Sequence, residues 1–205
     1  MKERILTEAE VLFWKYGVRS ITMDDIARQI GISKKTIYQH FTDKDDIVYQ
    51  VTSYRLEKDK ERVDCHIAEA VDPVEGMLKV SEMMREMMGN INPSLLIDIQ
   101  RYHPRAWQVY TDFRDKHVLE SVRVNLRNGI DRGYYRPDLD IETLARLRVE
   151  SVQLGFNPQL FPHKNLFNVQ MQLLHHFIRG ILTEKGFELY NYYQTTQSDE
   201  VTKFV

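Results

Sequence analysis

Length, composition and charge exclude several classes of protein before any motif is considered. The chain has 205 residues, 42% of them hydrophobic, which is enough for one large domain or for a small domain and a larger one. It contains no run of about 18 apolar residues, and its first residues are charged, so we expect a cytoplasmic protein with no membrane span and no secretory signal. The single cysteine, Cys65, agrees with a reducing compartment, and a net charge of −2 leaves any DNA binding to a local patch.

The first part of the chain contains the start and stop signals of four helices. Thr22 and Asp25 form a capping box at the start of the second helix, and Ser33 is placed to cap the third. Gly17 and Gly31 follow apolar periodic segments, as glycines do where helices end. The predicted helices are residues 2–16, 22–30, 34–41 and 42–65.

The fourth helix and the second half of the chain use the same signals. Thr42 and Asp45 predict the start of the fourth helix, Asp72 followed by Pro73 predicts the fifth, and Asp140 caps a later one. The later predicted helices are residues 73–88, a short one beginning at Asn92-Pro93, a long one from Pro104 to about Gly133, 141–155 and 165–185. The polar tail after Tyr193 is expected to fray. We therefore predict an all-α fold of about nine helices.

The second and third predicted helices have the layout of a helix-turn-helix that binds DNA. Ile37 and Phe41 are four residues apart and would dock the third helix onto Ile26 and Ile30, which leaves its polar side chains outward or at the flanks. Residues 26–44 contain four Lys or Arg residues and one acid. The alternative is a solvated surface helix, because short polar helices with two lysines are usually that.

A resemblance to a known family favours DNA binding. The first 50 residues or so resemble the TetR/AcrR-type bacterial transcriptional regulators. The resemblance rests on Gly17, Thr22, Ile26-Ala27, Gly31-Ile32-Ser33, Thr36-Ile37-Tyr38, His40-Phe41, Lys44 and Ile47. It implies a three-helix DNA-binding domain in residues 1–47 and a larger helical domain in residues 48–205 that binds a small molecule and dimerises through its last two helices.

The resemblance also implies roles for individual residues. Lys34, Lys35 and Thr36 occupy the start of the family's recognition helix, where bases are contacted. Lys44, near the N-terminus of the fourth helix, matches a phosphate-binding lysine. Asp24 departs from the pattern, because some members have a basic residue there, so the second helix is expected to add little to base recognition. The expected DNA-binding residues are Thr22, Ser33, Lys34, Lys35, Thr36, Tyr38, Gln39, His40 and Lys44; Tyr38 and His40 match phosphate-contacting positions, with packing against the first helix as the alternative for His40.

Two stretches of the chain are candidates for the ligand site. Five of the eight methionines lie in residues 77–88, and such flexible side chains suit a pocket for bulky apolar ligands, although simple core filling explains them equally well. The long helix carries a polar stripe among aromatic residues, away from a charged stripe that should face water. The hypothetical ligand-binding residues are Met83, Met84, Met87, Trp107, Tyr110, Phe113, Arg114, His117 and Ser121. Bonds to neighbouring helices, or a broader exposed side, are the alternative for the stripe.

The last two predicted helices combine apolar surface with small residues. The final helix is apolar over more than half its circumference, and small residues on both helices permit close approach. We expect a twofold four-helix interface, and burial within the monomer is the alternative. The hypothetical interface residues are Ala145, Val152, Gly155, Leu173, Phe177, Gly180 and Ile181.

Other chemistry finds little support in the sequence. His175 and His176 are adjacent and lack metal-ligand spacing, and no nucleophile or phosphate-loop motif occurs, so we expect no enzyme, metal or cofactor. We expect a ligand-responsive regulator, most consistent with a repressor, that binds a palindromic double-stranded DNA operator as a homodimer and is released by a small-molecule effector. The alternative is a helical small-molecule-binding or scaffolding protein without DNA binding. The sequence gives no information on the effector, the operator or the regulated genes, and no residue decides between repression and activation.

Overall fold

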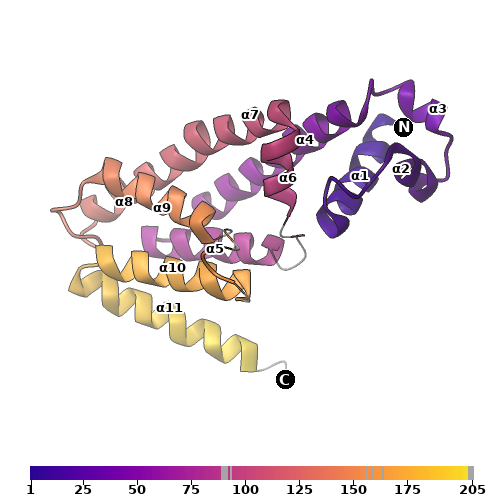
Figure 1. The fold of residues 1–205 in the computed structure, drawn as a ribbon. Helices are drawn as coiled ribbons and strands as arrows, with labels where there is room; N and C mark the ends of the chain where they lie inside the picture. The colour runs from indigo at the N-terminus through magenta and orange to yellow at the C-terminus, as the bar shows by residue number, and fades with distance from the viewer. Residues whose placement is uncertain (89–91, 93, 156, 158, 163, 203–205) are drawn as a thin grey trace. The chain divides into compact units, whose positions relative to one another are not determined.

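The computed structural model is helical, in agreement with the predicted all-α class (Figure 1). It describes residues 1–88, 92, 94–155, 157, 159–162 and 164–202, with side chains at all of these positions except 85–88, 167 and 197–202. Within this part of the chain, the only β-type pairing is an isolated bridge between Tyr135 and Leu182, and no helix is both long and apolar enough to cross a membrane. The helices are α1 (Lys2–Tyr16), α2 (Met23–Ile30), α3 (Lys34–Tyr38), α4 (Lys44–Ala68), α5 (Pro73–Met88), α6 (Leu95–Tyr102), α7 (Pro104–Phe113), a π-helical segment (Arg114–Val118), α8 (Leu119–Asp131), α9 (Ile141–Gly155), α10 (Leu166–Ile181) and α11 (Glu184–Thr202).

The chain forms two compact units, and each is built from two separate stretches of sequence. Unit 1 consists of Met1–Glu61 and Met87–Asp115, and unit 2 of Arg62–Glu86 and Lys116–Val205. The division points lie within α4, near the end of α5 and within the π-helical segment. Compactness does not test which residues bind DNA, so the functional division between residues 47 and 48 stays a prediction.

Unit 1 has a single hydrophobic core. Ile5 and Phe13 of α1 are buried with Ile26 of α2 and Ile47 of α4. The same cluster contains Leu95, Ile99 and Ala106 from α6 and α7. A backbone hydrogen bond from Asn92 N–H to Trp14 O, 2.7 Å long, ties the later stretch to the end of α1. The first three helices therefore share their interior with residues from the middle of the chain.

Unit 2 is built around α5, α8, α9, α10 and α11. Tyr135 and Tyr190 are almost completely buried in its core, together with Leu126 of α8 and Leu174 of α10. The Tyr135 hydroxyl donates to Pro73 O at 3.0 Å and also lies 3.0 Å from Asn125 Oδ1. Hydrogen bonds of Tyr135 therefore hold the connector after α8 to the start of α5.

Two predicted helices differ most from those observed, while smaller differences are that α3 ends at Tyr38 instead of Phe41 and that α4 spans Lys44–Ala68 instead of residues 42–65. The long helix from residue 104 to about 133 is continuous in the chain but contains the π-helical turn at Arg114–Val118, which adds a residue to the turn. The last predicted helix ends at Ile181 instead of Lys185, because Leu182 is extended, and α11 follows it. Thr183 begins α11 by accepting a hydrogen bond from Gly186 N–H at 3.1 Å. Helix α11 continues to Thr202, where fraying is predicted after Tyr193, and the last three residues of the predicted tail lie outside the described part of the structure.

Most predicted helix caps are confirmed, and one is wrong. Asp72 accepts hydrogen bonds from the N–H groups at the start of α5, and Asp140 does the same for α9. At α4, the first turn is capped by Asp43, whose Oδ1 accepts from Asp46 N–H at 2.8 Å, and not by Thr42. Asp45 makes side-chain contacts instead, because its carboxylate faces His103 and Arg105.

Candidate nucleic-acid interface

Helices α2 and α3 are joined by a tight turn with defined caps at each end. Thr22 and Asp25 form the predicted capping box, since the Thr22 hydroxyl accepts from Asp25 N–H and the Asp25 carboxylate accepts from Thr22 N–H. Gly31 ends α2 with φ of 74°, a left-handed conformation that favours glycine. Its N–H donates to Ala27 O at 3.0 Å. Local sequence therefore fixes the turn before α3.

Helix α3 is short, and its orientation is set by buried anchors. Ile37 is completely buried and Phe41, just beyond the helix, is 2% exposed, in the same cluster as Ile26 and Ile30. This agrees with the predicted docking of the helix. The opposite side of α3 and its flanks are open to solvent; the exposed residues are Ser33, Lys34, Lys35, Tyr38, Gln39 and His40.

Hydroxyl groups hold the first turn of α3. Ser33 Oγ accepts a hydrogen bond from Thr36 N–H at 3.1 Å, and the two hydroxyl oxygens lie 2.8 Å apart. Ser33 is therefore a helix cap as well as a predicted DNA contact. Thr36 is half-buried, and its hydroxyl is within hydrogen-bond distance of Ser33 in the free protein.

The lysines of this surface have unlike surroundings. Lys34 Nζ donates to Asp24 Oδ2 at 2.9 Å, and this hydrogen bond raises the pKa of Lys34. Lys44 is half-buried, and burial lowers the pKa of its ammonium group although Asp98 and Asp25 act in the opposite direction. Lys35 is exposed. Lys34 is thus paired with an acid, Lys35 is open to solvent, and Lys44 is partly covered by the protein.

Sequence reasoning missed several residues around this surface. Arg4 of α1 donates from Nη2 to Ile30 O at 3.0 Å, at the end of α2. His103 Nδ1 lies 2.8 Å from Asp45 Oδ1, and Arg105 lies 3.8 Å from the other oxygen of the same carboxylate. These contacts join residues distant in sequence, so no local pattern indicates them.

The hypothetical ligand-binding residues are divided between the two units. Trp107, Tyr110, Phe113 and Arg114 belong to unit 1, whereas Met83, Met84, His117 and Ser121 belong to unit 2. Met87 lies in α5, and its side chain is outside the described part of the structure.

Within each unit, the hypothetical ligand-binding residues differ in their contacts and in their exposure to solvent. Trp107 and Tyr110 stack with ring centroids 5.0 Å apart, and Arg114 is bonded to Asp115 at 2.9 Å. Met83 is buried, and His117 is exposed. The π-helical turn between Arg114 and His117 breaks the even 100° spacing on which the predicted polar stripe depends.

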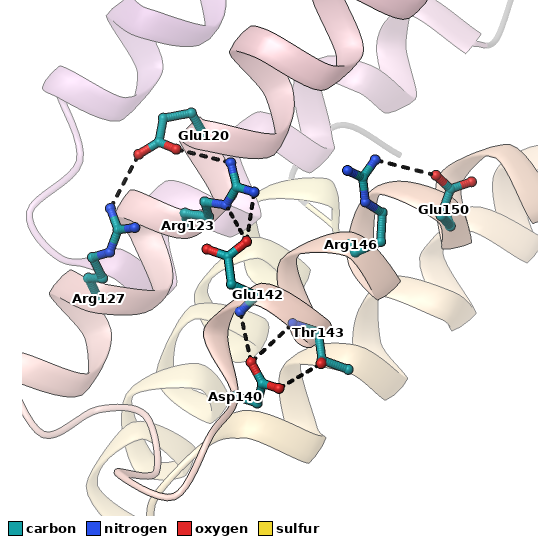
Figure 2. Close-up of polar contacts among 8 residues, drawn as sticks. All are labelled: Glu120, Arg123, Arg127, Asp140, Glu142, Thr143, Arg146 and Glu150. Atoms are coloured by element: carbon teal, nitrogen blue, oxygen red, sulfur yellow. Dashed lines mark hydrogen bonds and ion pairs between the residues drawn. The ribbon is translucent and has the colours of Figure 1, made fainter.

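Three of the four residues of the charged stripe predicted on the long helix, Glu120, Arg123 and Arg127, form an ion-pair network on the surface. Glu120 of α8 bonds to both Arg123 and Arg127 at 3.2 Å. Arg123 also reaches α9, with its Nη2 2.7 Å from Glu142 Oε2 (Figure 2). Ion pairs therefore join the outer sides of α8 and α9.

The hypothetical dimer residues divide into buried and accessible ones. Ala145, Phe177 and Ile181 lie in the hydrophobic core of unit 2, and Gly155 is buried against Gln170. Val152 and Leu173 are half-buried, and Gly180 is exposed. A partner could contact only the accessible positions, and the same two helices also expose Leu147 and Leu154.

Of the two histidines of α10, His175 packs against α11 and His176 is exposed. His175 Nδ1 lies 2.6 Å from the Tyr190 hydroxyl, and burial lowers the pKa of His175, as does nearby Arg179. Among the described residues, no three His, Cys, Asp or Glu side chains are grouped as metal ligands would be.

Comparison with known proteins places the α2–α3 arrangement in context. Residues 5–51 match the sequence profile of bacterial regulatory proteins of the tetR family. Over 156 residues the chain is 26% identical to the HTH-type transcriptional regulator UidR of Escherichia coli K12, covering 73% of this chain and 76% of the relative. Over 145 residues it is 26% identical to the HTH-type transcriptional repressor KstR2 of Mycobacterium tuberculosis H37Rv, covering 69% and 72%.

Solved structures show the same fold over most of the chain. The ketosteroid transcriptional regulator KstR2 of Mycobacterium tuberculosis has a TM-score of 0.62 at 23% identity, covering 89% of this chain and 95% of its own. A transcriptional regulator from Saccharomonospora viridis, in complex with choline, has a TM-score of 0.76 at 19% identity, covering 89% and 98%. The similarity extends well beyond the segment that matches the family profile.

Proposed function

Because the chain belongs to the TetR family of transcriptional regulators, which bind DNA and are not enzymes, we propose that it is a ligand-responsive repressor that binds a palindromic operator as a homodimer. The observation that carries this proposal is the exposed face of α3, where Lys34, Lys35, Tyr38, Gln39 and His40 are accessible while Ile37 anchors the helix. Repression is proposed because one relative, KstR2, is named a repressor.

The recognition surface divides into base-contacting and phosphate-contacting groups. Lys34, Lys35 and Thr36 lie at the N-terminal turn of α3, the part of a recognition helix that contacts bases in the major groove. Lys44 at the first turn of α4, together with Tyr38 and His40, would hold phosphates. Thr22, Ser33 and Gln39 complete the proposed contact surface.

A dimer is proposed because one copy of this surface supplies few phosphate contacts in a chain of net charge −2. Two copies would place their recognition helices in successive major grooves, about 34 Å apart, on a symmetric site. The proposed interface uses the accessible positions of α9 and α10, Val152, Leu173 and Gly180, with exposed Leu147 and Leu154 beside them. Sedimentation analysis of the full chain tests this, because a species that stays monomeric at high concentration contradicts it.

The effector is proposed to be a small molecule that binds the helical part of the chain beyond residue 47. A structural neighbour is described in complex with choline, which supports ligand binding on this fold. The effector would favour a conformation with lower DNA affinity by binding it more tightly. The predicted ligand residues of unit 1, Trp107, Tyr110, Phe113 and Arg114, and those of unit 2, Met83, Met84, His117 and Ser121, each stay a proposal within their own unit. If Phe113→Ala and His117→Ala both leave the dose response of DNA release unchanged, these two residues are not part of the site.

DNA binding is tested by selecting sequences from a random double-stranded library with the purified full chain. We expect enriched sequences with twofold symmetry and an affinity that falls steeply with salt. Enriched sites without symmetry contradict the dimeric operator. Failure to retard any DNA at low salt contradicts the function and favours the alternative, a helical small-molecule-binding or scaffolding protein.

A further inference from the structure

Helix α9 buries an arginine in the interior of unit 2. Arg148 is 8% exposed, and Ala145 and Val149 beside it on the helix belong to the hydrophobic core. Burial lowers the pKa of Arg148 to about 10, so the guanidinium remains charged at neutral pH. A permanently charged group is therefore almost fully shielded from solvent, next to core residues of the same helix.

This charge has little compensation from the protein. Within the described part of the chain, the only hydrogen bond of the Arg148 side chain runs from Nη1 to Ser151 Oγ, at 3.4 Å, which is long for such a bond. The Ser151 hydroxyl is itself directed to the backbone, since it donates to Arg148 O at 2.7 Å. A guanidinium has five N–H donors, so most of them have no protein acceptor among the described residues.

The acids of the same helix cannot serve as partners, because they are bound elsewhere. Glu142 pairs with Arg123 of α8, and Glu150 pairs with Arg146 at 3.9 Å (Figure 2). Both pairs lie on the solvent side, where the arginine and glutamate side chains are partly exposed. Among the described residues, the exposed Arg146 of this helix thus has an acid as its partner and the buried Arg148 has none.

A second arginine of the chain that is shielded from solvent is paired with acids, as buried charges usually are. Arg55 of α4, in unit 1, is also largely shielded from solvent, but its Nη1 lies 2.8 Å from Glu10 and its Nε 3.0 Å from both oxygens of Asp59. Although burial opposes the charged form, these two acids raise the pKa of Arg55. Buried charges in proteins are normally paired in this way, because desolvation of an unpaired ion is costly.

The helix next to Arg148 contributes another buried polar group. Gln170 of α10 is 8% exposed, and its Nε2 donates to Val152 O, one turn along α9 from Arg148, at 2.7 Å. Gly155 leaves room for this amide, because a side chain there would overlap it. Buried polar side chains of α9 and α10 therefore lie within about one turn of α9 from each other.

We propose that Arg148 binds an anionic group of the effector, a carboxylate or a phosphate, within unit 2. Planar guanidinium groups bind both kinds of anion through paired hydrogen bonds, and the strength of such bonds is greatest where water is excluded. The rest of the effector would contact the apolar side chains around Arg148. This inference specifies the chemical class of the effector and so rests on the proposed function.

The first test requires no knowledge of the effector. A buried unpaired charge destabilises the free protein, whereas an apolar side chain of similar length fits the same space. We expect Arg148→Met to have an equal or higher melting temperature than the unsubstituted chain, after both are refolded from denaturant in chloride buffer to remove bound molecules. Arg146→Met, in the exposed pair on the same helix, is the matched control and should change little. A clear loss of stability in Arg148→Met would show that the arginine has a structural role and overturn the proposal.

The second test uses defined anions. Sodium decanoate, sodium benzoate and inorganic phosphate are compared with decan-1-ol, which lacks the charge, by thermal unfolding of the full chain. We expect at least one organic carboxylate to raise the melting temperature by about 5 °C at saturation, and decan-1-ol to have a much smaller effect. Arg148→Met should weaken the apparent affinity for that carboxylate by about 30-fold or more, and Arg148→Lys by less.

The outcomes separate this proposal from the proposed function. An equal response in Arg148→Met, or no response to any of the three anions, overturns the anion site. A response to phosphate alone overturns the assignment to an organic effector. Because thermal unfolding does not require DNA, the anion response is measured even if the chain binds no operator, and a chain that binds DNA without responding to anions retains the proposed function without this site.

Discussion

Lys34 of α3 and Asp24 of α2 form an ion pair across the helix-turn-helix, with 2.9 Å between Nζ and the carboxylate oxygen. Both side chains remain about half exposed, so the pair contributes little to stability. Its effect is on the charge of the surface, because it sets a carboxylate beside a lysine proposed to contact DNA. Under the proposed function, the acid at position 24 would act on DNA binding through Lys34 even if α2 itself contacts no base.

Replacing Asp24 with Asn should strengthen DNA binding several-fold. The substitution removes a negative charge near the phosphates and releases Lys34 from its partner, so the salt dependence should steepen by about one counterion, a change of roughly 0.9 in the slope of log K against log salt. Fluorescence anisotropy at several salt concentrations measures both quantities. Asp64→Asn, an exposed change outside unit 1, is the charge-matched control. An unchanged slope in Asp24→Asn would contradict the idea that the pair restrains Lys34.

Replacing Lys44 with Ala should weaken binding to every DNA sequence by a similar factor. Lys44 is at the first turn of α4, and removing its phosphate-binding charge should reduce the salt slope by about 0.9 without affecting base preference. The same anisotropy titrations, on several unrelated DNA sequences, measure both properties. Lys60→Ala removes an exposed lysine farther along the same helix and should leave both unchanged.

Substitutions in α3 should behave differently from those in α4. Lys34→Ala and Thr36→Ala should change the relative affinity for operator variants, because these residues lie where bases are contacted. Identical losses on cognate and random DNA for Lys34, Thr36 and Lys44 would contradict the proposed division of roles.

Removing the cap of α2 should destabilise unit 1. Thr22→Ala leaves the N–H of Asp25 without its side-chain acceptor, a change that typically lowers the free energy of unfolding by about 1 kcal/mol. Urea unfolding measures the difference, and Thr7→Ala, within α1 and away from a helix start, is a control that should differ less. Equal losses in both variants would contradict a specific capping role.

The same cap should be sensitive to acid. The hydrogen bonds from Thr22 hold the pKa of Asp25 below its ordinary value of 3.8. A carboxylate with a lowered pKa in the folded state stabilises the fold above its unfolded pKa, and this contribution is lost as the pH falls through the folded pKa. The stability difference between the unsubstituted chain and Thr22→Ala should therefore shrink below about pH 4. A difference that grows in acid would contradict this.

Two helical glycines should respond oppositely to alanine. A methyl group at Gly129 would overlap the buried ring of Tyr135, so Gly129→Ala should lower stability by roughly 1–3 kcal/mol. Gly180 is exposed with open space around it, so Gly180→Ala should raise the stability of the single chain by roughly 0.5–1 kcal/mol. If Gly180 lies in the proposed dimer interface, sedimentation should also detect weaker association of Gly180→Ala. Unfolding at low protein concentration separates the two effects.

The features that the sequence predicts correctly are those with local causes. The stops at Gly17 and Gly31, the cap by Ser33 and the burial of Ile37 each depend on residues within a few positions of one another. The cap at Asp43 escapes prediction because Thr42 and Asp45 match the same capping signal one residue earlier in the sequence.

The features that the sequence fails to predict depend on distant residues. The π-helical turn at Arg114–Val118 adds one residue without any glycine or proline to mark it. Because α11 has the polar composition of a disordered tail, its sequence does not indicate that Tyr190 is buried. Tyr190 contacts His175 of α10, which is 15 residues earlier in the chain. Arg148 escapes prediction because an arginine in a helix is expected to be exposed, and periodicity cannot distinguish a buried charge from a solvated one.

The shared core of unit 1 has a consequence for recombination between relatives. Leu95, Ile99 and Ala106 pack in the same cluster as the first helices, so exchanging residues 1–47 between two proteins of this fold would set a foreign surface against residues 95–106. Grafting side chains onto the exposed face of α3 would leave that interior unchanged. If α3 contacts bases as proposed, the part that can be transplanted to change DNA specificity is thus the outer face of one short helix, and not the N-terminal segment.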